Sequence, residues 1–198
     1  MFQSVRYKII VTMFAICLLH SKLGAQATIE NYNSVTDSRL IDPEDHNWLS
    51  YRGTLDGWGF SKLEQINADN ISDLEPVWSF STGVLGGHES PPIVNDGVMF
   101  ITTPGNLLYA IEAATGDLLW RYQHNLPENY IAFHRTNRGV ALYGDKVYMA
   151  TLDARVVALD ASTGEKVWDT TVQDNSFGYY ITMAPLAIDG KDRKSTRL

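Results

Sequence analysis

The sequence predicts an all-β fold, a β-propeller of which this chain contains about the first two to three blades. The first observation is an internal repeat: the pattern Ala-x-[Asp/Glu]-x-x-Thr-Gly-x-x-x-Trp occupies residues 110–120 and returns, without a gap, at residues 158–168, 48 positions later. The second is the Thr-Gly pair between two apolar runs in each copy, which is typical of a tight hairpin. The third is the period, because repeats of roughly 40 to 50 residues with four short strands are typical of propeller blades. A β-sandwich with a chance duplication is the alternative.

Residues 1–27 have the pattern of a signal peptide. Basic residues precede an apolar run at residues 9–19, and the small residues Ala25 and Ala27 offer cleavage sites. The apolar run is short for a transmembrane helix, and no later run reaches spanning length. We therefore expect a periplasmic protein whose mature segment has no transmembrane anchor.

Charge, cysteine content and motifs exclude several classes of function. The formal net charge is −7, and the predicted leader carries three basic residues and no acidic one, so the mature protein disfavours nucleic acid and anionic lipid as partners. Cys17 is the single cysteine and lies in the leader, so the mature chain has no disulfide and no cysteine metal ligand. No Ser/His/Asp constellation, phosphate-binding loop or dinucleotide fingerprint occurs.

The segment before the repeats contains three predicted elements. Residues 28–47 are polar and lack a period, so we expect an extended lead-in to a partial propeller at residues 48–190. A capping-like pattern at residues 67–74 predicts a short helix or helical turn. Residues 74–80 alternate apolar and polar side chains and predict a strand, in which Trp78 would serve as a blade tryptophan of the ring's closing blade.

Two full repeats and the beginning of a third follow. Residues 91–122 and 139–170 are the full repeats, and residues 184–190 match the start of the first at an offset of 93. The third then stops, because residues 191–194 are all charged and cannot form a buried strand. We expect residues 191–198 to be a non-native tail on the front third or so of a larger protein, since two and a half blades cannot close a ring.

Three loops hold the polar side chains that could bind a ligand, each directly before a repeat. The first contains His88 and Glu89, the second Arg138 and the third Thr182. Because equivalent loops of successive blades converge toward one end of the propeller axis, an arginine near a carboxylate and a hydroxyl favours an anionic ligand there. Taken singly, each residue could equally be an ordinary loop or strand-end side chain, and His88 a loop hydrogen-bonding residue.

These stretches resemble the N-terminal part of the pyrroloquinoline-quinone (PQQ)-dependent dehydrogenases, the quinoprotein alcohol dehydrogenase family. The resemblance covers about residues 48–190 and rests on the two tryptophan motifs and on the stretches WSFSTGVLGGHESPP, TNRGVALYGDKVY, TLDARVVALD and GYYITMAPL. It implies an eight-bladed propeller of the quinoprotein type, in which tryptophan motifs dock successive blades and the quinone lies on the axis.

The resemblance also implies roles for individual residues. Glu89 matches a glutamate that contacts the cofactor. Arg138 matches an arginine that pairs with a quinone carboxylate, and Thr182 matches a threonine that hydrogen-bonds another carboxylate of the quinone. Many members carry adjacent cysteines five and six positions before that arginine, where this sequence has Phe133 and Ala132. We expect Phe133 to cover one face of the quinone by stacking.

The function implied is oxidation of an alcohol, polyol or sugar by hydride transfer to PQQ, with electrons passed to cytochrome c or a membrane quinone. Ca²⁺ or a lanthanide ion would polarise the quinone carbonyl, and an aspartate would be the base. The resemblance places the metal ligands and the base downstream, so we expect no catalytic or metal-ligating residue in this chain and no activity from it alone.

Two alternatives to an enzyme explain the repeats. A non-catalytic propeller scaffold, such as the lipoprotein of outer-membrane protein assembly, accounts for the tryptophan motifs but not for Glu89, Arg138 and Thr182 in their loops. A sugar-binding, lectin-like propeller is permitted by the Trp and Tyr content.

Overall fold

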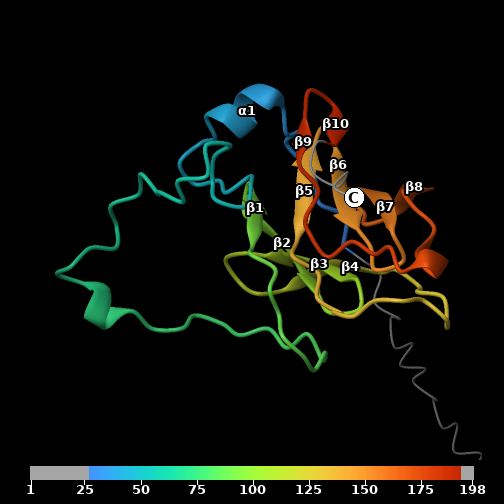
Figure 1. Cartoon of the computed structure of the whole chain (residues 1–198). Helices are drawn as coiled ribbons and strands as arrows, with labels where there is room; N and C mark the ends of the chain where they lie inside the picture. Colours follow the sequence, from blue (N-terminus) through green and yellow to red (C-terminus); the bar gives the residue numbers. More distant parts are fainter. Residues whose placement is uncertain (1–26, 193–198) are drawn as a thin grey trace, which may run out of the picture.

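The computed structural model describes residues 27–192 of the chain (Figure 1). The predicted signal peptide, except for its last residue, and residues 193–198 of the predicted tail lie outside the described residues. Regular structure in the described part is almost entirely antiparallel β-strand, in two four-stranded sheets and one two-stranded hairpin. The predicted all-β fold is confirmed.

Each predicted full repeat forms one four-stranded sheet. The first sheet has the order β1 (Ile93–Asn95), β2 (Val98–Thr103), β3 (Leu107–Glu112) and β4 (Leu118–Gln123). The second has the order β5 (Val140–Tyr143), β6 (Lys146–Ala150), β7 (Arg155–Asp160) and β8 (Lys166–Thr171). Both sheets have a register shift between their third and fourth strands, after Ala110 and after Ala158. The repeat in the sequence is therefore a repeat in hydrogen-bonding pattern, bulge included.

The third repeat begins as the first one does. Strand β9 (Ala187–Ile188) pairs with β10 (Lys191–Asp192). The turn residues between them, Asp189 and Gly190, have φ angles of 51° and 66°, and the equivalent Asp96 and Gly97 have 46° and 80°. Positive φ at both central positions is the geometry of a two-residue hairpin loop, which Asp-Gly adopts readily. We expected that the charged residues from Lys191 onward could not form a buried strand. Lys191 does lie in a strand, β10, but its side chain is exposed.

Trp120 joins the two blades. Its side chain is fully buried, and its Nε1 donates a hydrogen bond to the carbonyl oxygen of Ala161 at 3.0 Å. The indole ring lies over Gly164, so closely that a Cβ at this glycine would be 2.6 Å from the ring. The Thr-Gly turn of one blade is thus the surface on which the tryptophan of the preceding blade packs.

Trp78 repeats this arrangement on the first blade. Its Nε1 donates to the carbonyl oxygen of Ala113 at 3.0 Å, and its ring lies over Gly116, where a Cβ would be 2.6 Å away. The prediction that Trp78 serves as a blade tryptophan is therefore confirmed. Trp168, the third tryptophan of the series, is 40% exposed.

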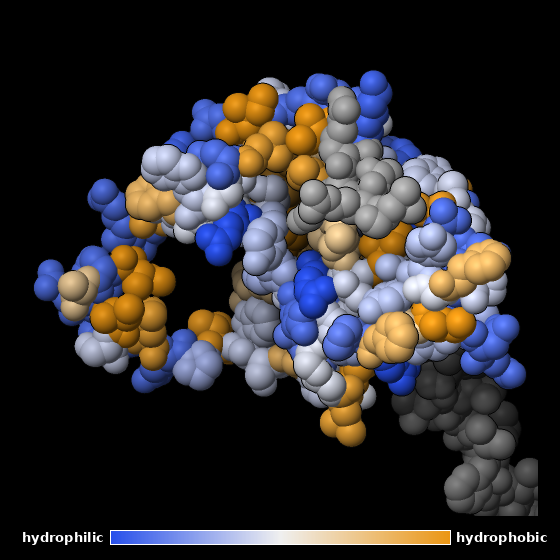
Figure 2. Space-filling view, viewed as in Figure 1, coloured by the Kyte–Doolittle hydropathy of each residue, from blue (hydrophilic) through white to orange (hydrophobic). Residues whose placement is uncertain are grey.

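The strand predicted at residues 74–80 is not formed. This segment is the end of a long excursion from the sheets (Figure 1), where the side chains of Trp78 and Phe80 return to the first blade, but no described strand pairs with its backbone. An alternating sequence becomes a strand only where a second backbone accepts and donates the ladder hydrogen bonds. The helical turn predicted at residues 67–74 is one turn of 3-10 helix, Ile71–Asp73. Large apolar side chains are exposed along the excursion (Figure 2), including Trp58, Phe60, Ile66, Ile71 and Val77.

The lead-in, predicted to be extended, contains helix α1 (Asp37–Ile41). Thr36 caps this helix by accepting a hydrogen bond from the backbone N–H of Arg39. Five helical residues are too few to produce a hydrophobic period, which is why the pattern did not predict them. A backbone bridge from Val35 to Gly144 ties the lead-in to the second sheet, and one from Trp48, directly after the lead-in, to Val94 ties its end to the first sheet.

Arg39 holds the lead-in together through its guanidinium group. It binds both carboxylate oxygens of Glu44 at 2.8 and 3.0 Å, the carbonyl oxygens of Asn33 and Ser34 at 3.1 Å, and Oδ1 of Asn95 in β1 at 2.9 Å. The hydrogen bonds from Arg39, and then that from Asn47, lower the pKa of Glu44 to about 2. The core lies between the sheets and the lead-in, and its large buried members include Val35, Leu40, Leu49, Phe100, Leu108, Trp120, Leu142 and Met149.

Candidate functional site

Three of the predicted site residues lie together. Nε of Arg138 forms an ion pair with Oε2 of Glu89 at 2.9 Å, and Nη1 of Arg138 donates to the hydroxyl oxygen of Thr182 at 2.6 Å. A backbone hydrogen bond of 2.8 Å from Arg138 to Thr182 joins the same two loops. The three loops that precede β1, β5 and β9 therefore meet at these side chains, as the repeat predicts.

These contacts orient the guanidinium of Arg138 but leave one of its nitrogens without a partner among the described residues. Nη2 donates no hydrogen bond to any residue that the structure describes. The side chains of Arg138 and Glu89 are each 46% exposed, and a half-exposed ion pair contributes little to stability. Nη2 thus remains available to donate to an anionic oxygen such as that of a carboxylate.

Glu89 is held at both of its carboxylate oxygens. Arg138 binds Oε2, and the hydroxyl of Thr136 donates to Oε1 at 3.3 Å. Thr136 also lines a second, open pocket of about 890 Å³ on the first blade, which the glycine-rich loop of residues 83–87 borders. The contact between Glu89 and Thr136 consequently stands at the boundary of two pockets.

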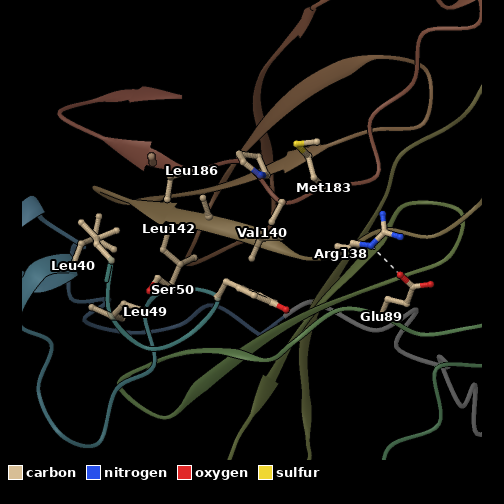
Figure 3. A pocket seen from close by; sticks show the side chains of 15 residues that line it. Leu40, Leu49, Ser50, Glu89, Arg138, Val140, Leu142, Met183 and Leu186 are labelled. Carbon is tan, nitrogen blue, oxygen red and sulfur yellow. Dashed lines mark ion pairs between the residues drawn. The ribbon is translucent and has the colours of Figure 1, made fainter. Parts of the chain in front are cut away.

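A pocket of about 380 Å³ begins at the ion pair between Arg138 and Glu89. Figure 3 shows this pair at one end and apolar side chains along the rest. Leu40 of the lead-in and residues 49–55 after it supply one wall, and β5 with the segment before β9 supplies the other; these walls include Leu40, Leu49, Tyr51, Val140, Leu142, Met183 and Leu186. A volume of this size, mostly apolar with a few convergent polar groups, is typical of a small-molecule site.

Asn137, which the sequence analysis did not single out, fixes the backbone beside Arg138. Its side chain is buried and fully hydrogen-bonded: Oδ1 accepts from Thr102 Oγ1 at 2.9 Å, and Nδ2 donates to Asn106 Oδ1 at 3.1 Å and to the carbonyl oxygen of Ala150 at 2.9 Å. Asn137 occupies the position in its repeat that Glu89 occupies in the first, 48 residues earlier. This equivalence of position in the two repeats is the sequence signal that points to Asn137.

Phe133 lies apart from the other predicted site residues. Its ring is 84% exposed and packs edge-on against Tyr180, with centroids 6.3 Å apart and planes at 61°. It is not among the residues that line the pocket at Arg138. His88 hydrogen-bonds within its own loop, to the carbonyl oxygen of Gly86 and to Thr82 Oγ1. It is therefore a loop hydrogen-bonding residue, the alternative given for it above.

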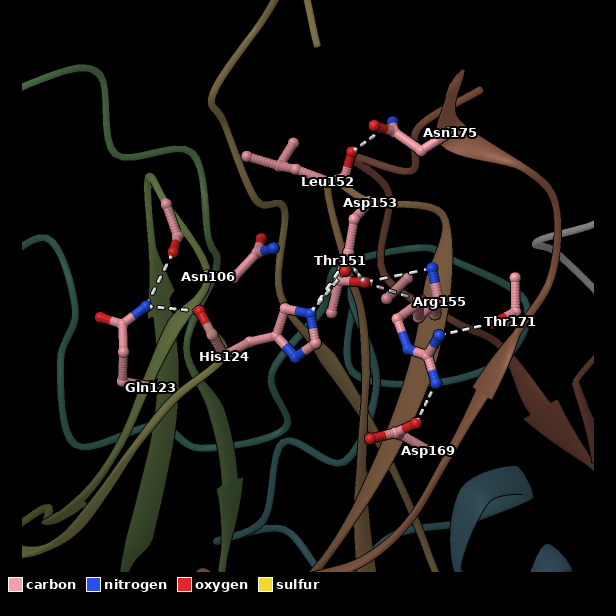
Figure 4. Close-up of polar contacts among 12 residues, drawn as sticks. Asn106, Gln123, His124, Thr151, Leu152, Asp153, Arg155, Asp169, Thr171 and Asn175 are labelled. Atoms are coloured by element: carbon pink, nitrogen blue, oxygen red, sulfur yellow. Dashed lines mark hydrogen bonds and ion pairs between the residues drawn. The ribbon is translucent and has the colours of Figure 1, made fainter. Parts of the chain in front are cut away.

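A buried acid–base pair links the two blades near these loops (Figure 4). Nε2 of His124, at the end of β4, lies 3.0 Å from both carboxylate oxygens of Asp153 in the turn between β6 and β7. The hydroxyl of Thr151 donates to the same carboxylate at 2.6 Å. Burial by itself raises the pKa of Asp153, but the hydrogen bonds from His124 and Thr151 outweigh it and hold that pKa below its usual value.

Within residues 27–192, no group of three or more His, Cys, Asp or Glu side chains is arranged to hold a metal ion. The same part of the chain contains no helix with the length and apolar character needed to cross a membrane.

Residues 48–170, which span both blades and the Trp78 segment, match the family model of the glucose/ethanol/alcohol dehydrogenase β-propeller domain, named PQQ. The chain belongs to this family. The family predicted from the sequence, the PQQ-dependent alcohol dehydrogenases, is confirmed, and so is the propeller fold.

Individual quinoproteins show the same relationship. The chain is 36% identical to the quinoprotein alcohol dehydrogenase PedH of Pseudomonas putida over 187 residues, which cover 90% of this chain and 31% of PedH. It is 46% identical to the quinoprotein ethanol dehydrogenase of Pseudomonas aeruginosa over 139 residues, which cover 68% of this chain and 22% of that protein.

Solved structures agree with the sequence comparison. The quinohemoprotein alcohol dehydrogenase ADHIIG from Pseudomonas putida aligns with a TM-score of 0.76 and 36% identity, over 83% of this chain and 25% of that one. A europium-containing methanol dehydrogenase aligns with a TM-score of 0.74 and 33% identity, over 79% and 28%. The chain spans less than a third of the length of each of these four relatives.

Proposed function

We propose that this chain is part of a periplasmic PQQ-dependent dehydrogenase that oxidises an alcohol, a polyol or a sugar. Membership of the quinoprotein family supports the general kind of reaction. The observation that carries the proposal is the cluster of Arg138, Glu89 and Thr182, because an oriented guanidinium that lines an apolar pocket and keeps Nη2 free to donate suits a flat, carboxylate-bearing cofactor.

The donor set fits PQQ. This cofactor carries several carboxylates on a fused aromatic ring system, so it needs cationic and hydroxyl donors at its rim and apolar surfaces against its faces. Arg138 supplies the cation, Thr182 supplies a hydroxyl, and the pocket beyond them is lined mainly by Leu, Val, Met and Ala side chains. When bound, PQQ supplies a quinone that accepts a hydride from the alcohol carbon.

The residues of this chain would bind and orient the cofactor in that reaction. Arg138 would form charge-assisted hydrogen bonds to a carboxylate, and the hydroxyl of Thr182 would donate another. Glu89 would keep the guanidinium in its plane, and its carboxylate could accept a hydrogen bond from a ring N–H. Phe133, whose exposed ring stands outside the pocket lining, would cover the face of the ring system that the pocket walls leave open, and the apolar walls would exclude water from the other contacts.

The remaining parts of the proposal extend beyond the described residues. We place the metal ligands and the aspartate base outside this chain, so the chain alone would be inactive. The metal would be Ca²⁺ or a lanthanide ion; the europium in a similar methanol dehydrogenase supports the second choice. Electrons would pass to cytochrome c or a membrane quinone, and nucleic acid would not be a partner.

Reconstitution of the protein expressed from its complete gene tests this proposal. The purified apoprotein should bind PQQ in the presence of Ca²⁺ or La³⁺, seen as a shift in the quinone absorbance. It should then reduce an artificial electron-accepting dye when given ethanol, 1-butanol, glycerol or glucose. A folded protein that binds no PQQ under either metal would contradict the proposal and favour a non-catalytic scaffold or a sugar-binding propeller.

A further inference from the structure

We infer that Asn175 is a positioning residue for the aromatic cover of the cofactor, an inference that rests on the proposed function. Asn175 lies in the loop between β8 and β9 and is the first residue of a 3-10 turn, Asn175–Phe177. It joins the loop that carries Phe133 to the loop that carries Tyr180 and Thr182. It therefore sets where the exposed ring of Phe133 stands.

The contacts of Asn175 are the evidence. Its Oδ1 accepts from the backbone N–H of Ile131 at 2.7 Å, and its Nδ2 donates to the carbonyl oxygen of the same residue at 2.8 Å. The amide thus pairs with both backbone groups of Ile131, as a neighbouring strand would. Nδ2 also donates to the carbonyl oxygen of Tyr179 at 2.7 Å. A weaker bond of 3.2 Å reaches the carbonyl oxygen of Leu152 (Figure 4).

These bonds fix three segments relative to one another. Ile131 is two residues before Phe133, Tyr179 is directly before Tyr180, and Leu152 is a fully buried residue of the turn between β6 and β7. The rings of Phe133 and Tyr180 meet edge-on at 6.3 Å just beyond the two pinned backbone sites. A ring that is 84% exposed has few contacts of its own to fix its position, so the backbone must do so.

Only an amide satisfies this arrangement. One side-chain oxygen must accept and one side-chain nitrogen must donate within the same plane, which Asn provides. Aspartate has the same shape but cannot donate, and it would place a negative charge against three carbonyl oxygens. Asn175→Asp consequently keeps the volume and the acceptor for Ile131 N–H but removes every hydrogen bond that Nδ2 donates.

The test compares this variant with Asn129→Asp in the complete protein. Asn129 is exposed in the loop that Asn175 clamps, and its side chain makes no hydrogen bond to any described residue, so Asn129→Asp introduces the same charge without touching the clamp. In the unliganded protein, amide hydrogen exchange at residues 125–137 and 172–182 should rise in Asn175→Asp and stay at the wild-type rate in Asn129→Asp. PQQ should bind about 3- to 10-fold more weakly to Asn175→Asp, the fold-change that loss of one aromatic contact corresponds to.

A double-mutant cycle separates positioning of the ring from general damage. If Asn175 acts through Phe133, then Phe133→Leu should cost PQQ affinity in the wild type and little more in Asn175→Asp. Additive losses, or unchanged exchange and affinity in Asn175→Asp, would overturn the inference while leaving PQQ binding by the wild type intact. Failure of the wild type to bind PQQ would instead contradict the proposed function, and the exchange experiment would still decide whether the clamp orders both loops.

Discussion

Trp120 of the first blade packs its indole on Gly164 of the second, and the approach leaves no room for a side chain at the glycine. A Cβ there would lie 2.6 Å from the ring, and the φ angle of Gly164 is +73°. The tryptophan also donates to the carbonyl oxygen of Ala161 at 3.0 Å. Since Trp78 and Gly116 repeat the arrangement, this contact is the unit of blade-to-blade docking.

Gly164→Ala should therefore separate the blades. The methyl group must displace the buried indole, and alanine is strained at positive φ, so the free energy of unfolding should fall by about 2–4 kcal/mol. Gly144→Ala is the matched control, because Gly144 has a φ of +61° and nothing within 4 Å of the added atom; it should cost only about 1 kcal/mol. Urea unfolding measures both. Equal losses would mean that the turn conformation, and not the tryptophan contact, requires glycine.

The pair between His124 and Asp153 should make the free energy of unfolding fall at acidic pH. The pKa of Asp153 is held below its usual value in the folded protein, so its contribution is present above about pH 4 and is lost as pH falls through the folded pKa. Asp153→Asn should cost about 2–3 kcal/mol near neutral pH, and this cost should shrink below about pH 4. Urea unfolding of both proteins between pH 3 and pH 7 tests this. A cost that is the same at every pH would show that the carboxylate charge is not involved. The control is Asp69→Asn, which removes a carboxylate in an exposed loop.

Arg39 should be required for the lead-in to cover the pocket. Its side chain is 12% exposed and bonds to Glu44, Asn95 and two backbone carbonyls. Arg39→Met would leave these acceptors unpaired, at about 2–4 kcal/mol of stability, and should make residues 28–47 sensitive to protease. Lys62→Met removes an exposed pair with Asp42 and should leave both properties unchanged. A protected lead-in in Arg39→Met would show that the backbone bridges from Val35 and Trp48 are sufficient.

The sequence predicted the blades because their repeat has no gap, so strands, bulges and tryptophan contacts recur at one spacing. It predicted the meeting of Glu89, Arg138 and Thr182 because equivalent loops of adjacent blades share one end of the sheets. It failed at residues 74–80, where an alternating pattern has no described strand to pair with. It also missed α1, which is too short to show a period.

The hydrogen bonds of the Asn137 and Asn175 side-chain amides could not be predicted from any sequence pattern. Asn137 and Asn175 act through single side chains that reach backbone groups of other segments, 44 positions away between Asn175 and Ile131. Such contacts depend on the folded path of the loops and leave no periodic trace in the sequence. The exposed position of Phe133, away from the pocket lining, was likewise not visible in the residues alone.

The affinity of the complete protein for PQQ in wild type and Arg138→Ala tests the central claim most directly. Arg135→Ala is the control, because Arg135 lies in the same loop and its side chain makes no hydrogen bond or ion pair to any described residue. Loss of the charge-assisted hydrogen bonds predicts that Arg138→Ala binds PQQ about 10- to 100-fold more weakly, with Arg135→Ala close to the wild type. Equal PQQ affinity in wild type and Arg138→Ala would contradict the assignment of this site.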